Sequence, residues 1–184
     1  MLFRSTKGAG VTVNTTIVVG CTLDSGGAPI DYISLHDECN ITINSGTWSY
    51  VNGGNRRSRG DLPIGTSDKD AKLNITINGG EFTYVGINVM CAVGMNSFEG
   101  ESNLTINGGK FHASVYGLSR VGSNSTPNPA KMTGTVNITI NGGEFLGKII
   151  HHQDATTTIT GKVNITIASK YENLLSGFTN VTKK

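Results

Sequence analysis

The chain has 184 residues, of which 15% are charged and 7% aromatic, and its formal net charge at pH 7 is +2. This length suits one domain with a hydrophobic core, so we expect residues 1–184 to form a single domain. The small, mixed charge argues against nucleic acid or an anionic membrane as a partner. No segment is long and apolar enough to be a membrane span.

Neither a targeting segment nor the cysteines fix the cellular compartment. The first twenty residues contain no apolar run of signal-peptide length, so an exported protein would carry its targeting segment outside this chain, which would then be a fragment. Cys21, Cys39 and Cys91 have neither metal-ligand nor redox spacing. This odd set favours isolated buried thiols over a disulfide framework.

A nine-residue phrase recurs along the chain. Residues 1–10 form an N-terminal edge, and Val11–Val19 reads as an early, imperfect copy. The clear copies begin at intervals of 34, 29, 34 and 27 residues, at Asn40, Asn74, Asn103, Asn137 and Asn164. Repeats of this period predict an array in which each unit covers its neighbour.

Each copy contains a strand, a corner and a second strand. Ile41 and Ile43 alternate with Asn40 and Thr42, which is the pattern of a strand with one buried face. Asn-Gly-Gly follows and predicts a sharp turn, and a second apolar pattern begins at the next aromatic residue, as in Phe82, Tyr84 and Val85. Asn-Gly between strands can also form a hairpin, and a chain of hairpins would make a propeller, but propeller blades need about 40 or more residues. Leucine-rich repeats are a second alternative, but they need a leucine framework that these repeats lack. We therefore expect parallel strands stacked at about 4.8 Å.

The segments between copies carry the candidate ligand-binding groups outside the strands. Residues 52–72 concentrate charged side chains that could grip an acidic polysaccharide, namely Arg56, Arg57, Arg59 and Asp61. A solvated loop is the simpler interpretation, and Arg59-Gly60-Asp61 also spells the tripeptide that integrins recognise. Residues 118–135 are rich in Ser, Asn, Gly and Pro and read as a projecting return segment.

Two short clusters suggest acid–base or metal chemistry. His151-His152-Gln153-Asp154 and His36-Asp37-Glu38 each combine imidazole with carboxylate. Consecutive strand residues point to opposite faces, however, so neighbouring histidines are not expected to share one ligand. We therefore predict no metal site and no cofactor.

The C-terminal copy has two interpretations. Ser169-Lys-Tyr-Glu172 followed by Leu174 resembles a capping box with a short helix, and it can equally continue the aromatic column as a strand, which we favour. We expect stacked coils over residues 11–175 and a C-terminal tail over 176–184.

The repeated Asn-Ile-Thr-Ile-Asn-Gly-Gly-x-Phe unit, over about residues 11–175, resembles the right-handed parallel β-helix repeats of the pectate-lyase-like superfamily. The resemblance implies an all-β solenoid of about six coils. That superfamily includes polysaccharide lyases and hydrolases, phage tailspikes and noncatalytic adhesive modules of bacterial surface proteins, so the fold does not choose the function.

In such a stack each repeat position becomes a column. We expect a buried aromatic column of Trp48, Phe82, Phe111 and Phe145. We expect an amide ladder at the corner, formed by Asn44, Asn78, Asn107 and Asn141, as the resemblance also implies. Beside the aromatic column, Glu81, Lys110 and Glu144 alternate in charge.

An outward hydroxyl face is the candidate binding surface. It comprises Thr42, Thr76, Thr105 and Thr139, with Thr166 beyond them, flanked by the first Asn of each copy. Thr is also simply a good strand residue, and the remaining alternatives are polysaccharide binding and an ordered-water or ice-binding face.

The leading hypothesis is that the chain is a noncatalytic structural or adhesive module of an exported, bacterial surface protein. Its partner would be a polysaccharide or a cell-surface glycan. The chain would also associate with itself through the ends or sides of the stack. The alternative is a polysaccharide lyase or glycoside hydrolase of the same superfamily, or a degenerate relative. A lyase would present acidic calcium ligands and a basic residue on adjoining coils, and no such set recurs in register.

Overall fold

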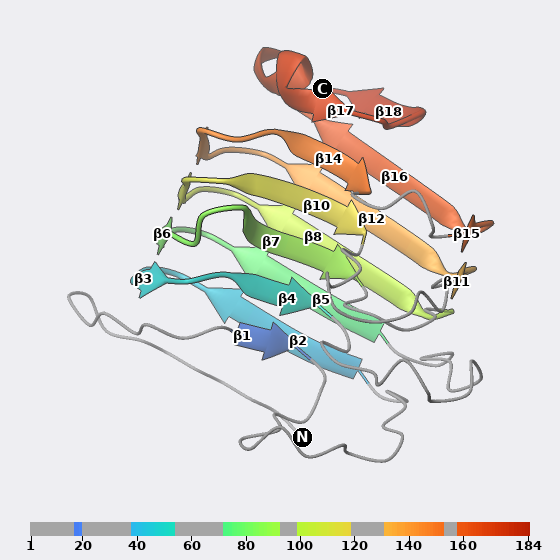
Figure 1. Cartoon of the computed structure of the whole chain (residues 1–184), viewed down its shortest axis with the longest axis horizontal. Helices are drawn as coiled ribbons and strands as arrows, with labels where there is room; N and C mark the ends of the chain where they lie inside the picture. Colours follow the sequence, from blue (N-terminus) through green and yellow to red (C-terminus); the bar gives the residue numbers. More distant parts are fainter. Residues whose placement is uncertain (1–16, 20–37, 54–71, 93–98, 119–130, 153–157) are drawn as a thin grey trace.

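A computed structural model describes residues 17–19, 38–53, 72–92, 99–118, 131–152 and 158–184. These residues form β-strands and one short helix, and their strand pairs are parallel (Figure 1). The four repeats that begin at Asn40, Asn74, Asn103 and Asn137 each contribute one strand to each of three sheets. Because successive copies stack in parallel, the hairpin alternative is excluded.

The first strand of each repeat enters the long-strand sheet. Its members, in chain order, are β2 (Glu38–Ile43), β5 (Lys72–Ile77), β8 (Glu101–Ile106), β12 (Thr135–Ile140), β16 (Lys162–Ile167) and β18 (Asn180–Lys183). Pairing is in register throughout, so that equivalent residues lie side by side, as Thr76 does with Thr42 and Thr105. Like residues therefore form continuous columns.

Two further sheets complete each repeat. The corner sheet contains β3 (Thr47–Trp48), β6 (Glu81–Phe82), β9 (Lys110–Phe111) and β13 (Glu144–Phe145). The facing sheet contains β1 (Ile17–Val19), β4 (Val51–Gly53), β7 (Ile87–Ala92), β10 (Ser114–Leu118), β14 (Ile149–His152) and β17 (Leu175–Ser176). A two-stranded sheet joins β11 (Lys131–Met132) to β15 (Thr158–Ile159).

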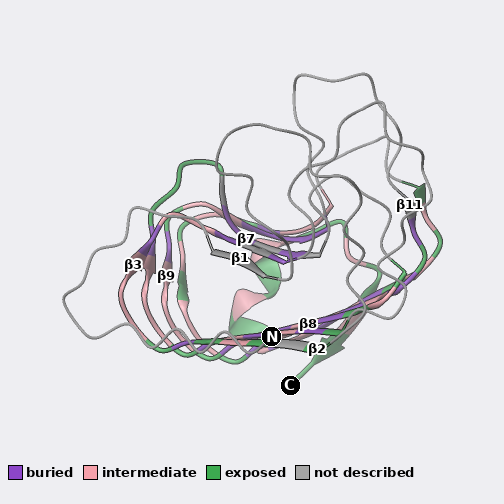
Figure 2. Ribbon diagram, turned by 90° about the horizontal axis from the view of Figure 1, so that it is seen from below, coloured by how far each residue is buried: buried purple, intermediate pink, exposed green. Residues whose placement is uncertain are grey.

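The core lies between the long-strand sheet and the facing sheet, which Figure 2 shows opposite one another. Buried hydrophobic residues of both sheets belong to one core cluster. Every second residue of the four inner long strands is buried, as Leu73, Ile75 and Ile77 are in β5. Val89 and Val115 close the core from the facing sheet. The period-two pattern thus places one face of each strand in the core and leaves the other for solvent.

The two glycines of each corner are required for different reasons. Gly109 has φ +106°, a conformation that L side chains rarely adopt. A Cβ added to Gly108 would lie 2.5 Å from the backbone oxygen of Asn78 in the preceding repeat. The second glycine therefore supplies the turn, and the first allows the repeats to approach. At the position of this first glycine, the first copy has Ser45, and its strand β3 is the edge of the described corner sheet.

The second strand of the repeat starts later than the sequence pattern indicates. Tyr84 and Val85 are 48% and 90% exposed and lie in a turn, and strand β7 begins at Ile87. Asn88 is the extra residue of a β-bulge, because the register with β10 shifts there. Its buried amide accepts from the backbone N–H of Ala113 and donates to the backbone oxygen of Tyr84, so the bulge leaves no stranded amide.

In the C-terminal copy, the segment around Tyr171 is a helix and not the predicted strand. Ser169–Leu174 form a 3₁₀ helix, η1, in which Tyr171 nevertheless meets Phe145 edge-on at 5.4 Å between ring centroids. The stacked region also extends beyond residue 175, because β18 pairs with β16 in the tail predicted for 176–184.

The N-terminal copy is only partly described. Ile17–Val19 of the early copy pairs with β4 and so belongs to the facing sheet, not to the long-strand sheet. The predicted N-terminal edge, residues 1–10, lies outside the described ranges.

Candidate functional site

The corner asparagines form a hydrogen-bonded ladder. The side-chain Nδ2 of each donates to Oδ1 of its equivalent in the preceding repeat, over 2.8, 2.8 and 2.6 Å, in the column Asn44, Asn78, Asn107, Asn141. Lys184 Nζ donates to Oδ1 of Asn141 at the C-terminal end. Because an ammonium group only donates, it fixes the direction in which the ladder runs.

A second amide ladder crosses the long-strand sheet, formed by the first Asn of each copy. It runs through Asn40, Asn74, Asn103, Asn137 and Asn164 with Nδ2–Oδ1 distances of 2.8, 2.9, 2.9 and 2.9 Å. Glu38 and Glu101 accept the second N–H of Asn74 and Asn103. Sequence reasoning placed these residues only on an amide-bearing surface. The signal in the sequence was that Asn is depleted in strands, so an Asn that recurs in every long strand indicates a hydrogen-bond partner for its side-chain amide.

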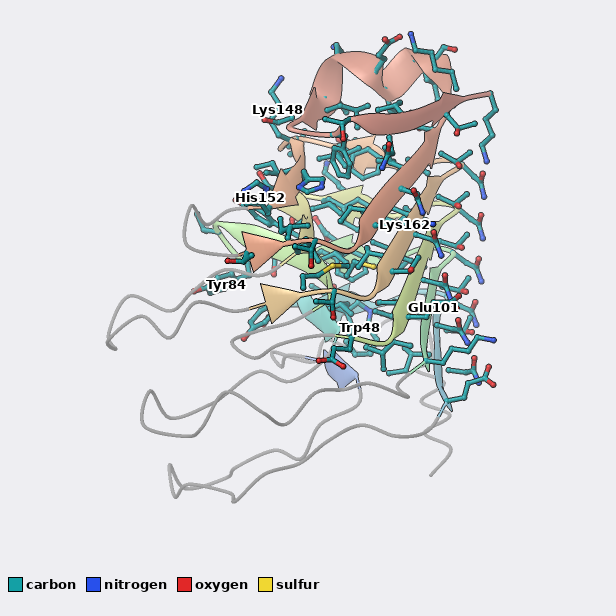
Figure 3. All side chains as sticks on the ribbon, turned by 90° about the vertical axis from the view of Figure 1, so that its right-hand side faces the viewer. Trp48, Tyr84, Glu101, Lys148, His152 and Lys162 are labelled. Atoms are coloured by element: carbon teal, nitrogen blue, oxygen red, sulfur yellow. The ribbon has the colours of Figure 1, made fainter. Side chains whose placement is uncertain are left out.

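The Thr column lies between the two ladders on the same outward face. Thr42 is exposed, and Thr76, Thr105 and Thr139 are half-buried. Within the described part of the chain, none of these four hydroxyls has a protein hydrogen-bond partner. Figure 3 shows the outward side chains of the long-strand sheet in rows, beside the labelled Glu101 and Lys162. The face is thus a flat grid of neutral donors and acceptors with strand spacing of about 4.8 Å.

The aromatic column faces the core. Trp48 is 5% exposed, and Phe82 and Phe111 are fully buried, as predicted. Phe145, predicted to be buried as well, is only half-buried and packs against the core. The rings of Phe82, Phe111 and Phe145 stack nearly parallel, with centroids 4.8 and 4.9 Å apart. The Trp48 indole N–H donates to Ser45 O over 3.1 Å. A column packed in this way offers no ring face to a sugar.

Beside the aromatic column, the alternating charges of Glu81, Lys110 and Glu144 form only one of the two ion pairs that the alternation suggests. Lys110 Nζ lies 3.2 Å from Glu144 Oε1, whereas Glu81 Oε1 lies 2.7 Å from His112 Nε2. These side chains are exposed, and such pairs contribute little to stability.

The predicted loop site cannot be placed. Arg56, Arg57, Arg59 and Asp61 lie outside the described residues, as do His36, Asp37, and residues 119–130 of the second loop. No group of three or more His, Cys, Asp or Glu side chains in the described ranges could hold a metal ion.

The two neighbouring histidines come together, against the expectation from strand alternation. His151 Nδ1 and His152 Nδ1 are 2.8 Å apart, and the rings are nearly perpendicular at 81°. One ring donates its N–H to the lone pair of the other. Burial, and then the neighbouring His152, lower the pKa of His151 below its ordinary value of 6.5.

Cys91 is a free thiol buried in the core. Burial raises its pKa to about 12, although the hydrogen bond between its thiol and the Ser102 side chain acts in the opposite direction. The Ser102 hydroxyl donates to the Cys91 backbone oxygen over 2.6 Å, which links the facing sheet to the long-strand sheet. Cys91 is therefore an isolated buried thiol, as predicted, and its burial makes it unreactive. Cys21 lies outside the described ranges.

No protein-family model matches the chain, and searches of curated proteins and of solved structures gave no significant match. The one described helix is too short to cross a membrane. The polar face of the long-strand sheet, defined by the Thr column and the two amide ladders, is the best-formed candidate site.

Proposed function

We propose that the chain is a right-handed parallel β-helix of the pectate-lyase-like kind that serves as a structural or adhesive module of an exported surface protein. The parallel, in-register sheets and the repeated corner support this architecture. The partner that we propose is a polysaccharide or cell-surface glycan bound along the polar face.

The observation that carries the proposal is the row of Thr hydroxyls between two amide ladders, for which the described residues supply no hydrogen-bond partner. A hydroxyl both donates and accepts, so a row of them matches the hydroxyl groups of a sugar chain. Each interior amide of the second ladder uses one N–H and one lone pair on its neighbours. Among the described residues, no protein group accepts the second N–H of Asn137 or Asn164. The amides are already held rigidly, so less conformational entropy is lost when a ligand binds.

The charge of the face favours a neutral glycan. The Thr and Asn columns are uncharged, and the column at the start of the long strands mixes Glu38, Lys72, Glu101 and Lys162. An acidic polysaccharide would be favoured instead by the Arg side chains of residues 52–72.

A glycan array with the purified chain tests the proposal. We expect retention of neutral, linear glycans and no formation of reducing or unsaturated ends. The double variant Thr105→Val/Thr139→Val keeps β-branched side chains but removes two hydroxyls, and it should lower retention, whereas Thr105→Ser/Thr139→Ser should preserve it.

Other outcomes would redirect the proposal. Retention that depends on Arg56, Arg57 and Arg59 would move the site to the loop. Turnover of a polysaccharide would favour the enzyme alternative, and lack of retention by any glycan would overturn the adhesive role.

A further inference from the structure

The histidine pair lies at the point where the C-terminal segment meets the stack. Strand β14 carries the pair, and its neighbour β17 matches it only as far as Ile150↔Ser176. Beyond that point the chain turns at Gly177, with φ +80°, and the ring of Phe178 stands against His151 at 5.3 Å and 79°. Phe178 also packs on the hydrophobic core. The C-terminal segment, residues 175–184, is therefore seated partly on His151.

The hydrogen bond between the histidines survives one added proton but not two. In the neutral pair, one Nδ1–H donates to the other Nδ1. If His152 alone is protonated, its Nδ1–H still donates to neutral His151, and a charge-assisted bond is the stronger one. When both rings are protonated, both Nδ1 atoms are donors. The bond is then lost, and two cations face one another across 2.8 Å.

No charged side chain from the described neighbours offsets that repulsion. On one side, β10 presents Gly117 and Leu118 to this part of β14. On the other side, the C-terminal segment presents Gly177 and Phe178. Lys148, earlier in the same repeat, donates its ammonium to the backbone oxygen of Asn173. Asp154 lies outside the described residues.

We propose that His151 and His152 form an acid-sensitive latch that keeps the C-terminal segment on the stack near neutral pH and loosens it in mildly acidic solution. The lowered pKa of His151 gives the sign: the folded segment binds fewer protons than the unfolded chain, so its stability falls as the pH drops below 6.5. The unfastened segment would uncover the edge of β16, which β18 otherwise pairs.

Hydrogen exchange of the amides in β18, corrected for intrinsic rates, tests the latch. Between pH 7.5 and pH 5 we expect protection to fall about three- to tenfold in the wild-type chain, the loss of about one hydrogen bond. In His151→Gln and His152→Gln the fall should disappear. The matched control is His112→Gln, which removes the imidazole that pairs with Glu81 in the corner sheet and should leave the pH dependence of β18 unchanged.

A proton titration of the wild-type histidines by NMR keeps the proposal testable if a variant fails to fold. Two coupled steps, with one step below the ordinary histidine range, are expected. Independent titration of the two rings would overturn the latch. So would protection of β18 that is constant with pH, or a pH dependence that persists in both glutamine variants or disappears only when Asp154 is replaced.

Discussion

Replacing Gly108 by Ala should be among the most costly single-methyl changes in the molecule. The new Cβ would lie 2.5 Å from the backbone oxygen of Asn78. Relief requires the two repeats to separate by several tenths of an ångström, which strains the bonds from Asn107 N to Ile77 O at 2.7 Å and from Lys110 N to Gly80 O at 2.8 Å. Overpacking of this kind costs about 1–3 kcal/mol, and the two hydrogen bonds, weakened but not broken, together add about 1 kcal/mol. We expect a total of about 2–4 kcal/mol.

Urea denaturation followed by Trp48 fluorescence measures this effect. With an m-value of about 2 kcal/mol/M, the midpoint should fall by about 1–2 M. The matched control is Ser45→Ala, at the same corner position of β3, the edge of the described corner sheet. This change should alter stability by no more than about 0.5 kcal/mol. Equal midpoints for the two variants would refute the idea that close approach between repeats requires Gly108.

Three further predictions concern the columns. Phe111→Ala removes the central ring of the buried stack and should cost about 3–5 kcal/mol in the same assay, whereas Tyr84→Ala in an exposed turn should cost less than about 1 kcal/mol. Asn107→Ala breaks two ladder bonds and should lower the melting temperature more than Asn44→Ala, which breaks only the terminal one; the reverse order would contradict the ladder. Because burial raises the pKa of Cys91 to about 12, a thiol reagent at pH 8 should modify it only at the rate of unfolding, and fast modification of the native chain at this residue would show that it is accessible.

Much of the fold is predictable because the same strand and turn pattern recurs in each copy of the repeat. The alternation around Ile41 and Ile43 predicts the long strands, and the Asn-Gly-Gly corner predicts the turn into the corner sheet. Parallel stacking follows from the repeat length, and the structure confirms it. The start of the facing strand was less predictable, since Tyr84 and Val85 read as buried but lie in an exposed turn made possible by Gly86.

Other features of the structure depend on side-chain contacts that the alternation of polar and apolar residues does not reveal. Tyr171 reads either as a helical residue or as a member of the aromatic column, and the structure makes it both. His151 and His152 should diverge by strand alternation, but they lie at the end of β14, where their rings meet. The second amide ladder was hidden because its Asn residues occupy ordinary outward strand positions.

Disulfide trapping between equivalent strands tests the central claim, that successive copies lie side by side in register to build the polar face. In a chain with Cys21→Ser and Cys39→Ser, the variant Thr105→Cys/Thr139→Cys pairs neighbours of β8 and β12, with Cα atoms about 5 Å apart. The offset variant Thr105→Cys/Asn141→Cys separates them by about 8 Å. We expect rapid bridge formation in the first variant and almost none in the second. Equal yields, or a preference for the offset pair, would contradict it.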